Sequence, residues 1–299
     1  DISPFSEKFG GGVLSTTINK YITVEVKQND KNNLEDNKLV AAILEEFGCG
    51  KKYYVKIKSD VPPNSGLGGS AATAVSLIGA LNKMNKLKLK KEEIAEAAFL
   101  IERYDIGNLG GRQDQYASVF GGLNFIEFFG GSKVKVTPIK LKSSVYKSLE
   151  ENSLLVYIGS RTQSGNIIKT YSQEALHKTK NLTLEMKRNL IGGNLDNVGM
   201  LLEHAWDQKK KFTPLMSNKF IDRVYKIARH NGAIGGKIMG AGGGGHMLFL
   251  CIDKQKAMKE TLHLRPNLHF SFNFVAVAAL LKAGELFNHL SQLWIQDRK

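Results

Sequence analysis

The sequence is poor in cysteine and proline and has no long apolar run. Its two cysteines, Cys49 and Cys251, lie far apart and fit neither a disulfide framework nor a metal or redox motif. We therefore expect a reducing, cytoplasmic compartment. The longest apolar stretch, residues 270–281, contains serine and asparagine and is shorter than the roughly 20 residues that cross a bilayer. We expect no membrane partner.

Acidic residues are also scarce, at 28 against 42 lysines and arginines, which gives a formal net charge of +14. Such an excess attracts anions, among them nucleotides, sugar phosphates and nucleic acids. Basic and aromatic residues do not alternate as they do on nucleic-acid stacking platforms, so we expect no nucleic-acid partner. The histidines show no paired spacing for a metal, and we take them as structural. The sequence begins at Asp1, without a methionine or a signal-like stretch, so we expect a segment before it.

The first half of the chain predicts a mixture of strands and helices. Residues 12–26 and 51–58 are rich in β-branched and aromatic residues, as strands are. Helical spacing of apolar residues predicts helices over 37–47, 71–83 and 91–104.

The following segments continue this pattern. Residues 122–128 and 133–138 flank Gly130-Gly131 and predict a hairpin. A buried strand is expected at 154–158, a mainly helical region at 173–230 and a closing strand at 246–252. A strand-rich first half and a helical second half favour α+β layers over repeated βαβ units.

A glycine-rich segment, Pro62 to Ala72, follows the strand at 51–58 and leads directly into a helix of small residues. Backbone N–H groups of such a turn, together with the positive end of the helix, form a phosphate cradle. The P-loop spacing GxxxxGK[ST] occurs nowhere in the chain, which argues against a P-loop nucleotidase. A second glycine-rich segment, Lys237 to Gly245, precedes the closing strand.

These two segments resemble the GHMP kinase family, which includes galactokinase, homoserine kinase, mevalonate kinase and phosphomevalonate kinase. The family's second motif, Pro-x-x-x-Gly-Leu-Gly-Ser-Ser-Ala, corresponds to Pro62–Ala71, with Gly69 replacing the first serine. Its third motif corresponds to Lys237–Gly245. The resemblance implies that ATP contacts Pro63, Ser65, Gly66, Leu67, Gly68, Gly69, Ser70, Ala71, Gly240, Ala241, Gly242 and Gly243.

Phosphoryl transfer also requires carboxylates, one for the metal and one near the attacking hydroxyl. By the same resemblance, Glu102 and Ser70 hold Mg²⁺, and Asp114 is the base or hydroxyl-orienting carboxylate. A lone glutamate on a charged helix is also compatible with a solvated position. Asp114 lies in the glycine-rich stretch Gly110 to Ala117, which is poor material for a plain surface acid.

Within the family, three blocks most resemble kinases that phosphorylate the anomeric hydroxyl of D-glycero-D-manno-heptose 7-phosphate. They are residues 1–11, residues 111–122 and residues 202–210. Asp1 would bind sugar hydroxyls, because a carboxylate accepts two hydrogen bonds. Arg161 and Lys209 are candidates for the phosphate that the sugar already carries, although Lys209 also fits a solvated lysine run.

The resemblance implies a ribosomal-S5-like N-terminal half at 1–150, which binds ATP, and a ferredoxin-like C-terminal half at 151–299. We expect the family's first motif, a strand followed by Gly-Gly-Gly-Thr, to lie before Asp1, and the tail after about residue 262 departs from the family pattern. Two other functions stay open: a GHMP kinase of another sugar, such as fucose or galactose, and an inactive nucleotide-binding relic. The oligomeric state is not predicted.

Overall fold

The computed structural model describes residues 1–30, 37–160 and 172–264. Its first half, up to residue 138, alternates short strands and helices. The elements are α1 (Ser3–Phe9), β1 (Gly11–Thr16), β2 (Ile22–Gln28), α2 (Lys38–Phe47), β3 (Tyr53–Ser59), α3 (Gly69–Met84), α4 (Lys91–Leu100), the π-helical turn η1 (Ile101–Asp105), α5 (Gln113–Phe120), β4 (Leu123–Phe128) and β5 (Val134–Pro138).

The second half is mainly helical, as predicted, but contains three strands rather than two. The elements are α6 (Ser143–Asn152), β6 (Ser153–Gly159), α8 (Gln173–Gly192), α9 (Leu195–Lys210), the 3₁₀ turn η2 (Pro214–Met216), α10 (Lys219–His230), β7 (Ala233–Ile238), β8 (Gly245–Cys251) and α11 (Lys254–Leu262). The predicted departure of the tail after about residue 262 falls almost wholly outside the described residues.

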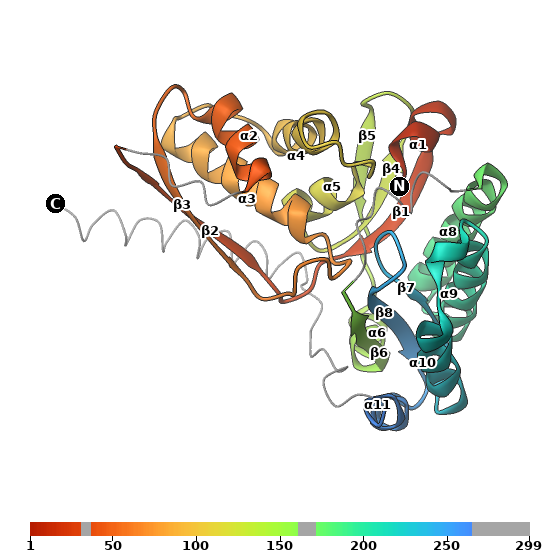
Figure 1. Ribbon diagram of the computed structural model, residues 1–299. Coiled ribbons are helices and arrows are strands. Elements are labelled where there is room, and N and C mark those ends of the chain that lie inside the picture. The colour runs from red at the N-terminus through yellow and green to blue at the C-terminus, as the bar shows by residue number, and fades with distance from the viewer. Residues whose placement is uncertain (31–36, 161–171, 265–299) are drawn as a thin grey trace.

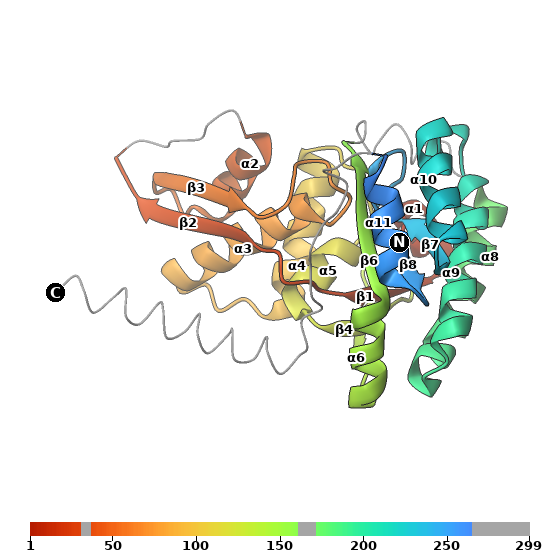
Figure 2. The ribbon, with the colours of Figure 1, turned by 90° about the horizontal axis from the view of Figure 1, so that it is seen from below.

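The strands form three antiparallel groups, β1-β4-β5, β2-β3 and β6-β8-β7. The predicted hairpin is confirmed, because β4 and β5 pair antiparallel across Gly130-Gly131. Figures 1 and 2 show the β2-β3 pair at one end of the molecule and the β6-β8-β7 sheet toward the other end, where α8, α9 and α10 lie outermost.

Strand β4 joins the two halves because both of its faces are buried. Leu123 and Phe125 point to one face, where they pack in a cluster with α8 and α9 residues such as Leu190. Ile126 and Phe128 point to the other face, where they pack against α4 and α5. Alternate residues of a strand face opposite sides, so a single strand supports two cores.

Helix α3 is fixed beneath the first glycine loop by its small and apolar residues. Its buried positions Ala74, Leu77, Ile78 and Leu81 have no exposed surface and recur at helical spacing. They pack in one cluster with α2 and β3. Each fully buried Leu or Ile of this kind stabilises the fold by roughly 1.5–3 kcal/mol. The start of α3 is therefore a rigid platform.

No helix in the described ranges is both long enough and apolar enough to cross a bilayer. Cys49 is exposed and Cys251 is buried, and both are free thiols. Trp206 has no exposed surface.

Candidate active site

The first glycine loop ends at the N-terminus of α3, where the amides of the first helical turn can donate hydrogen bonds to a ligand. The N-cap of this helix is Gly68, which has no side chain to accept a hydrogen bond from the first turn. The first amides of a helix lack partners within the helix, and the helix dipole makes this end positive. This is the local structure that the sequence predicted for a phosphate cradle.

Ser70 and Glu102 meet at this helix end. The Ser70 hydroxyl donates a hydrogen bond of 2.5 Å to Oε1 of Glu102, although the two residues come from different helices. The Gln115 amide donates to the other carboxylate oxygen at 2.6 Å. Glu102 is only 2% exposed, so the solvated alternative for this residue is wrong. Burial raises the pKa of Glu102, and the negative charge of Asp114 adds to that rise.

The π-helical turn η1 aims Glu102 inward. Here the helix of residues 91–104 departs from the sequence prediction, since α4 ends at Leu100 and a wider turn continues to Asp105. The amide of Ile106 donates to the carbonyl of Ile101, and the amide of Asn108 donates to the carbonyl of Glu102. Such turns are frequent at functional sites. Helical periodicity gives no sign of this change.

Asp114 lies beside the first glycine loop. A Cβ added at Gly68 would lie 3.5 Å from the carboxyl carbon of Asp114. Asp114 is in the first turn of α5 and is half-buried, and the side-chain amide of its neighbour Gln113 donates to Oδ1 at 3.1 Å. The structure therefore brings Ser70, Glu102 and Asp114 together, as the sequence predicted.

Asp1 reaches the same place from the start of the chain. The backbone amide of Arg112 donates to its Oδ2 at 2.6 Å, whereas its Oδ1 is buried and has no hydrogen-bond partner among the described residues. Glycine is required at position 111, because a Cβ there would collide with the Asp1 carboxylate. Arg112 is itself fixed by ion pairs to Glu7 at 3.1 Å and Glu96 at 2.9 Å. One acceptor oxygen of Asp1 is thus left available to a ligand.

The second glycine loop connects β7 to β8, and the side chain of Lys209 forms hydrogen bonds with its first residues. The Nζ atom of Lys209 donates to the carbonyls of Ile238, at 3.2 Å, and Gly240, at 2.5 Å. Lys209 is 8% exposed, so the alternative of a solvated lysine is wrong. Burial lowers the pKa of Lys237, in the adjacent strand β7.

Sequence reasoning missed two residues that contact these groups. Gln115 belongs to the same Gln-Asp-Gln motif as Asp114, and the presence of amides on both sides of the acid could have marked it. His246 directly follows the second glycine loop and contacts the first, which no pattern along the chain could indicate. Arg161 lies outside the described residues.

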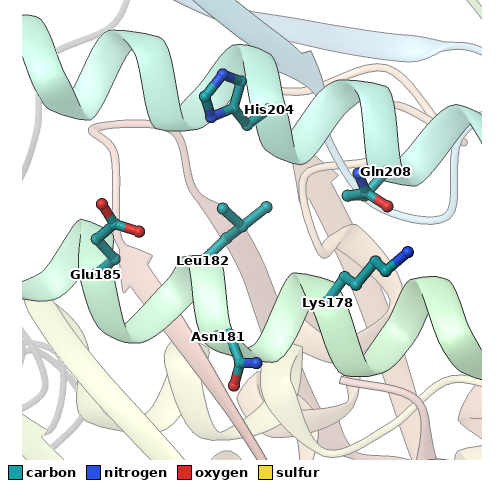
Figure 3. A pocket seen from close by; sticks show the side chains of 6 residues that line it. All are labelled: Lys178, Asn181, Leu182, Glu185, His204 and Gln208. Atoms are coloured by element: carbon teal, nitrogen blue, oxygen red, sulfur yellow. The ribbon is translucent and has the colours of Figure 1, made fainter.

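A groove of about 330 Å³ between α8 and α9 lies apart from this site. Figure 3 shows Lys178, Leu182 and Glu185 of α8 facing His204 and Gln208 of α9. None of the residues predicted to bind ATP, metal or sugar lines it. The groove is not the meeting point of Ser70, Glu102 and Asp114. In the described part of the chain, moreover, no three His, Cys, Asp or Glu side chains cluster as metal ligands.

Comparison with known proteins shows the family of this fold. Residues 37–122 match the model of the GHMP kinases N terminal domain, and residues 186–262 match that of the GHMP kinases C terminal. A D-glycero-alpha-D-manno-heptose 7-phosphate kinase from Campylobacter jejuni is 33% identical, over 92% of this chain and 91% of the relative. An Arabidopsis thaliana bifunctional fucokinase/GDP-fucose pyrophosphorylase is 27% identical over 78% of this chain, which spans 23% of that protein.

Solved structures show the same fold. A D-glycero-D-manno-heptose 1-phosphate kinase from Bacteroides thetaiotaomicron superposes with a TM-score of 0.71 at 25% identity, covering 92% of this chain and 91% of that one. A putative sugar kinase from Campylobacter jejuni gives a TM-score of 0.71 at 31% identity, with 92% and 90% covered. The predicted α+β GHMP kinase fold and the predicted ATP-dependent sugar kinase are confirmed. The chain belongs to the GHMP kinase family.

Proposed function

We propose that this kinase transfers the γ-phosphate of ATP to the anomeric hydroxyl of D-glycero-D-manno-heptose 7-phosphate, forming the 1,7-bisphosphate and ADP. The observation that carries the proposal is the position of Asp114, beside Gly68 of the first glycine loop and near the Ser70–Glu102 pair. The heptose is inferred from the Campylobacter jejuni relative, whose similarity extends over nearly the whole of both chains.

Asp114 acts on the acceptor hydroxyl. Its carboxylate takes the hydroxyl proton while the sugar oxygen bonds to the γ-phosphorus and the bond from that phosphorus to the bridging oxygen of ADP breaks. A positioned carboxylate contributes about 10²–10⁴-fold to such a step. Amides of both glycine loops offset the charge that develops on the phosphoryl oxygens.

The residues around Glu102 fit a magnesium ion. Mg²⁺ in phosphoryl-transfer sites is held by one or two carboxylates plus substrate phosphates rather than by a full set of protein ligands. Ser70 and Glu102 supply one hydroxyl and one carboxylate 2.5 Å apart, and Gln115 Oε1 is buried without a partner among the described residues. Burial and the charge of Asp114 both destabilise the ionised Glu102, which a cation would offset. The ion would neutralise charge on the β- and γ-phosphates.

Asp1 is proposed to bind the sugar. Its buried Oδ1 has no partner among the described residues, and an ionised carboxylate oxygen is a strong acceptor for sugar hydroxyls. Arg161 stays a proposal for the 7-phosphate. We propose that Lys209 supports the second loop, because its Nζ atom donates to the carbonyls of Ile238 and Gly240.

The test is an ADP-release assay on a panel of acceptors. Heptose 7-phosphate should give the highest kcat/KM, above unphosphorylated heptose, fucose and galactose. The highest value for fucose would assign the chain to the other sugar-kinase alternative, for which the Arabidopsis thaliana relative is the precedent. If the chain binds ATP but phosphorylates none of these acceptors, the alternative of an inactive nucleotide-binding relic is favoured.

Two broader predictions accompany this proposal. A division into an ATP-binding half at 1–150 and a second half at 151–299 is compatible with the two matched segments. A cytoplasmic location rests on the free thiols of Cys49 and Cys251 and on the expected supply of ATP there.

A further inference from the structure

The two glycine loops, 181 residues apart at their point of contact, are joined by one buried side chain. His246 is the second residue of β8 and has no exposed surface. Its Nδ1 atom lies 2.8 Å from the carbonyl oxygen of Ser65, in the first loop. A carbonyl only accepts, so Nδ1 carries the proton and donates. Burial lowers the pKa of His246, which favours this neutral donor at physiological pH.

The backbones of the two loops touch at the same place. Gly245 has φ of +87°, and a Cβ there would collide with the Ser65 carbonyl oxygen. On the other side of that peptide, a Cβ at Gly66 would lie 3.0 Å from the carbonyl oxygen of Met239. The side chain of His246 and the absence of side chains at two glycines together allow this approach.

The peptide between Ser65 and Gly66 is the part of the first loop that this contact fixes. A trans peptide is planar, so its C=O and N–H point in opposite directions. Holding the Ser65 carbonyl toward β8 therefore holds the Gly66 N–H away from β8. A peptide that precedes glycine flips readily, because glycine has no Cβ to oppose the change. After a flip, the carbonyl would take the place of the N–H and repel a phosphate.

We propose that His246 is a positioning residue for ATP, which locks the Ser65–Gly66 peptide so that the Gly66 N–H serves the phosphate cradle. The inference rests on the proposed function only in taking residues 62–72 as the ATP phosphate cradle. It does not depend on which sugar is the acceptor.

The test compares three variants of the full chain with the wild type by their affinity for the non-hydrolysable analogue AMP-PNP with Mg²⁺. In His246→Leu the donor is lost, and the dissociation constant should rise about tenfold, as expected for an unsatisfied buried carbonyl. In His246→Asn the amide nitrogen occupies the place of Nδ1, and the constant should stay within about threefold of wild type. The matched control is Met247→Leu, the neighbouring buried position of β8, with an expected change under about twofold.

Two further measurements distinguish positioning of the Ser65–Gly66 peptide from a general packing effect of the His246 side chain. The affinity for adenosine, which has no phosphate, should be the same in all variants, and the KM for the sugar phosphate should change by less than about twofold. If His246→Leu does not fold, His246→Gln replaces it, because its amide lies one bond farther out and should bind AMP-PNP more weakly than the Asn variant does.

The proposal is overturned if the Asn variant is as weak as the Leu or Gln variant, if the Leu variant binds AMP-PNP like wild type, or if adenosine affinity falls in parallel. Failure of the heptose assignment would appear elsewhere, as absent turnover on heptose 7-phosphate in the wild-type protein. The AMP-PNP series would still give its result.

Discussion

The two glycine loops are both proposed to bind phosphate but are built differently. The first stands at the N-terminus of α3 and is surrounded by carboxylates, Glu102 and Asp114. The second is a turn between two strands and is supported by the ammonium group of Lys209. The acid groups proposed for the metal and the acceptor thus come from the first half of the chain, and the ammonium group of Lys209 comes from the second. A nucleotide between the loops would have the carboxylates of the first half on one side and the ammonium group of the second half on the other. Neither half provides both charges alone.

The strongest test of this division is removal of the acid next to the first loop. Asp114→Asn keeps the shape but loses the proton acceptor, so kcat should fall about 10³-fold while the KM for ATP changes little. Steady-state kinetics on heptose 7-phosphate measure both. The control is Asp222→Asn, an exposed carboxylate in the first turn of α10, which should keep wild-type kcat. Wild-type turnover by the Asp114 variant would remove Asp114 from the mechanism.

A smaller loss is expected at the other carboxylate. Glu102→Gln keeps a hydrogen-bond partner for Ser70 but lacks the charge for Mg²⁺, so kcat should fall about 10²-fold and half-maximal activity should require more Mg²⁺. Titration of activity with MgCl₂ measures this change. Asp105→Asn, an exposed acid on the same π-helical turn, is the matched control. An unchanged magnesium requirement would contradict the assignment of Glu102.

The loop in the second half is tested through its lysine. Lys209→Met leaves the carbonyls of Ile238 and Gly240 without their donor, which should cost about 2 kcal/mol of stability and raise the KM for ATP about tenfold. Thermal denaturation and kinetics measure the two effects. Lys210→Met, which removes an exposed neighbour paired with Asp207 at 3.0 Å, should cost less than about 0.5 kcal/mol. A selective rise in the KM for the sugar phosphate would instead support direct contact of Lys209 with the substrate.

The smallest effect concerns stability and pH. Burial raises the pKa of Glu102, so the folded state holds its proton at pH values where the unfolded chain, with a glutamate pKa near about 4.3, has lost it. Stability therefore falls as pH rises through this interval and stays lower above it. Without Mg²⁺, Glu102→Gln should melt at a higher temperature than wild type at about pH 7.

This difference in melting temperature should shrink as the pH approaches about 4, where Glu102 is protonated in both states. Denaturation scans in EDTA across that range measure it, with Asp105→Asn as the control. A Gln variant that is less stable than wild type at about pH 7 would show that the ionised carboxylate is compensated within the protein itself.

The sequence predicted those elements whose residues follow a regular period. The helices beginning at Lys38 and Gly69 and the β4-β5 hairpin lie within a few residues of their expected bounds. Strand β7 was missed because glycines interrupt its pattern. Those glycines serve packing: a Cβ at Gly235 would collide with the backbone of Gly199 in α9, and one at Gly236 with Phe249. A short-range pattern carries no information about such a neighbour.

The candidate site was predicted in part for a similar reason. Glycine loops and acids near them are visible along the chain, so the proximity of Ser70, Glu102 and Asp114 could be expected from family resemblance. The bonds of Lys209 and His246 could not, because they join side chains to carbonyls far away in sequence. Every residue has a backbone carbonyl, so the pattern of residue types does not show which carbonyl a distant side chain contacts.

The π-helical turn at Ile101–Asp105 has a consequence for how this protein tolerates insertions and deletions. Such a turn holds one residue more than the α-helical turn it replaces, and each residue of an α-helix rotates the next by about 100°. Deleting a single residue between Glu102 and Asp105 would let α4 continue regularly and would rotate the residues after the deletion, which lead toward Asp114, relative to Glu102. The number of residues in this short segment therefore matters as much as the presence of the acid at position 102. A surface loop of equal length could gain or lose a residue freely.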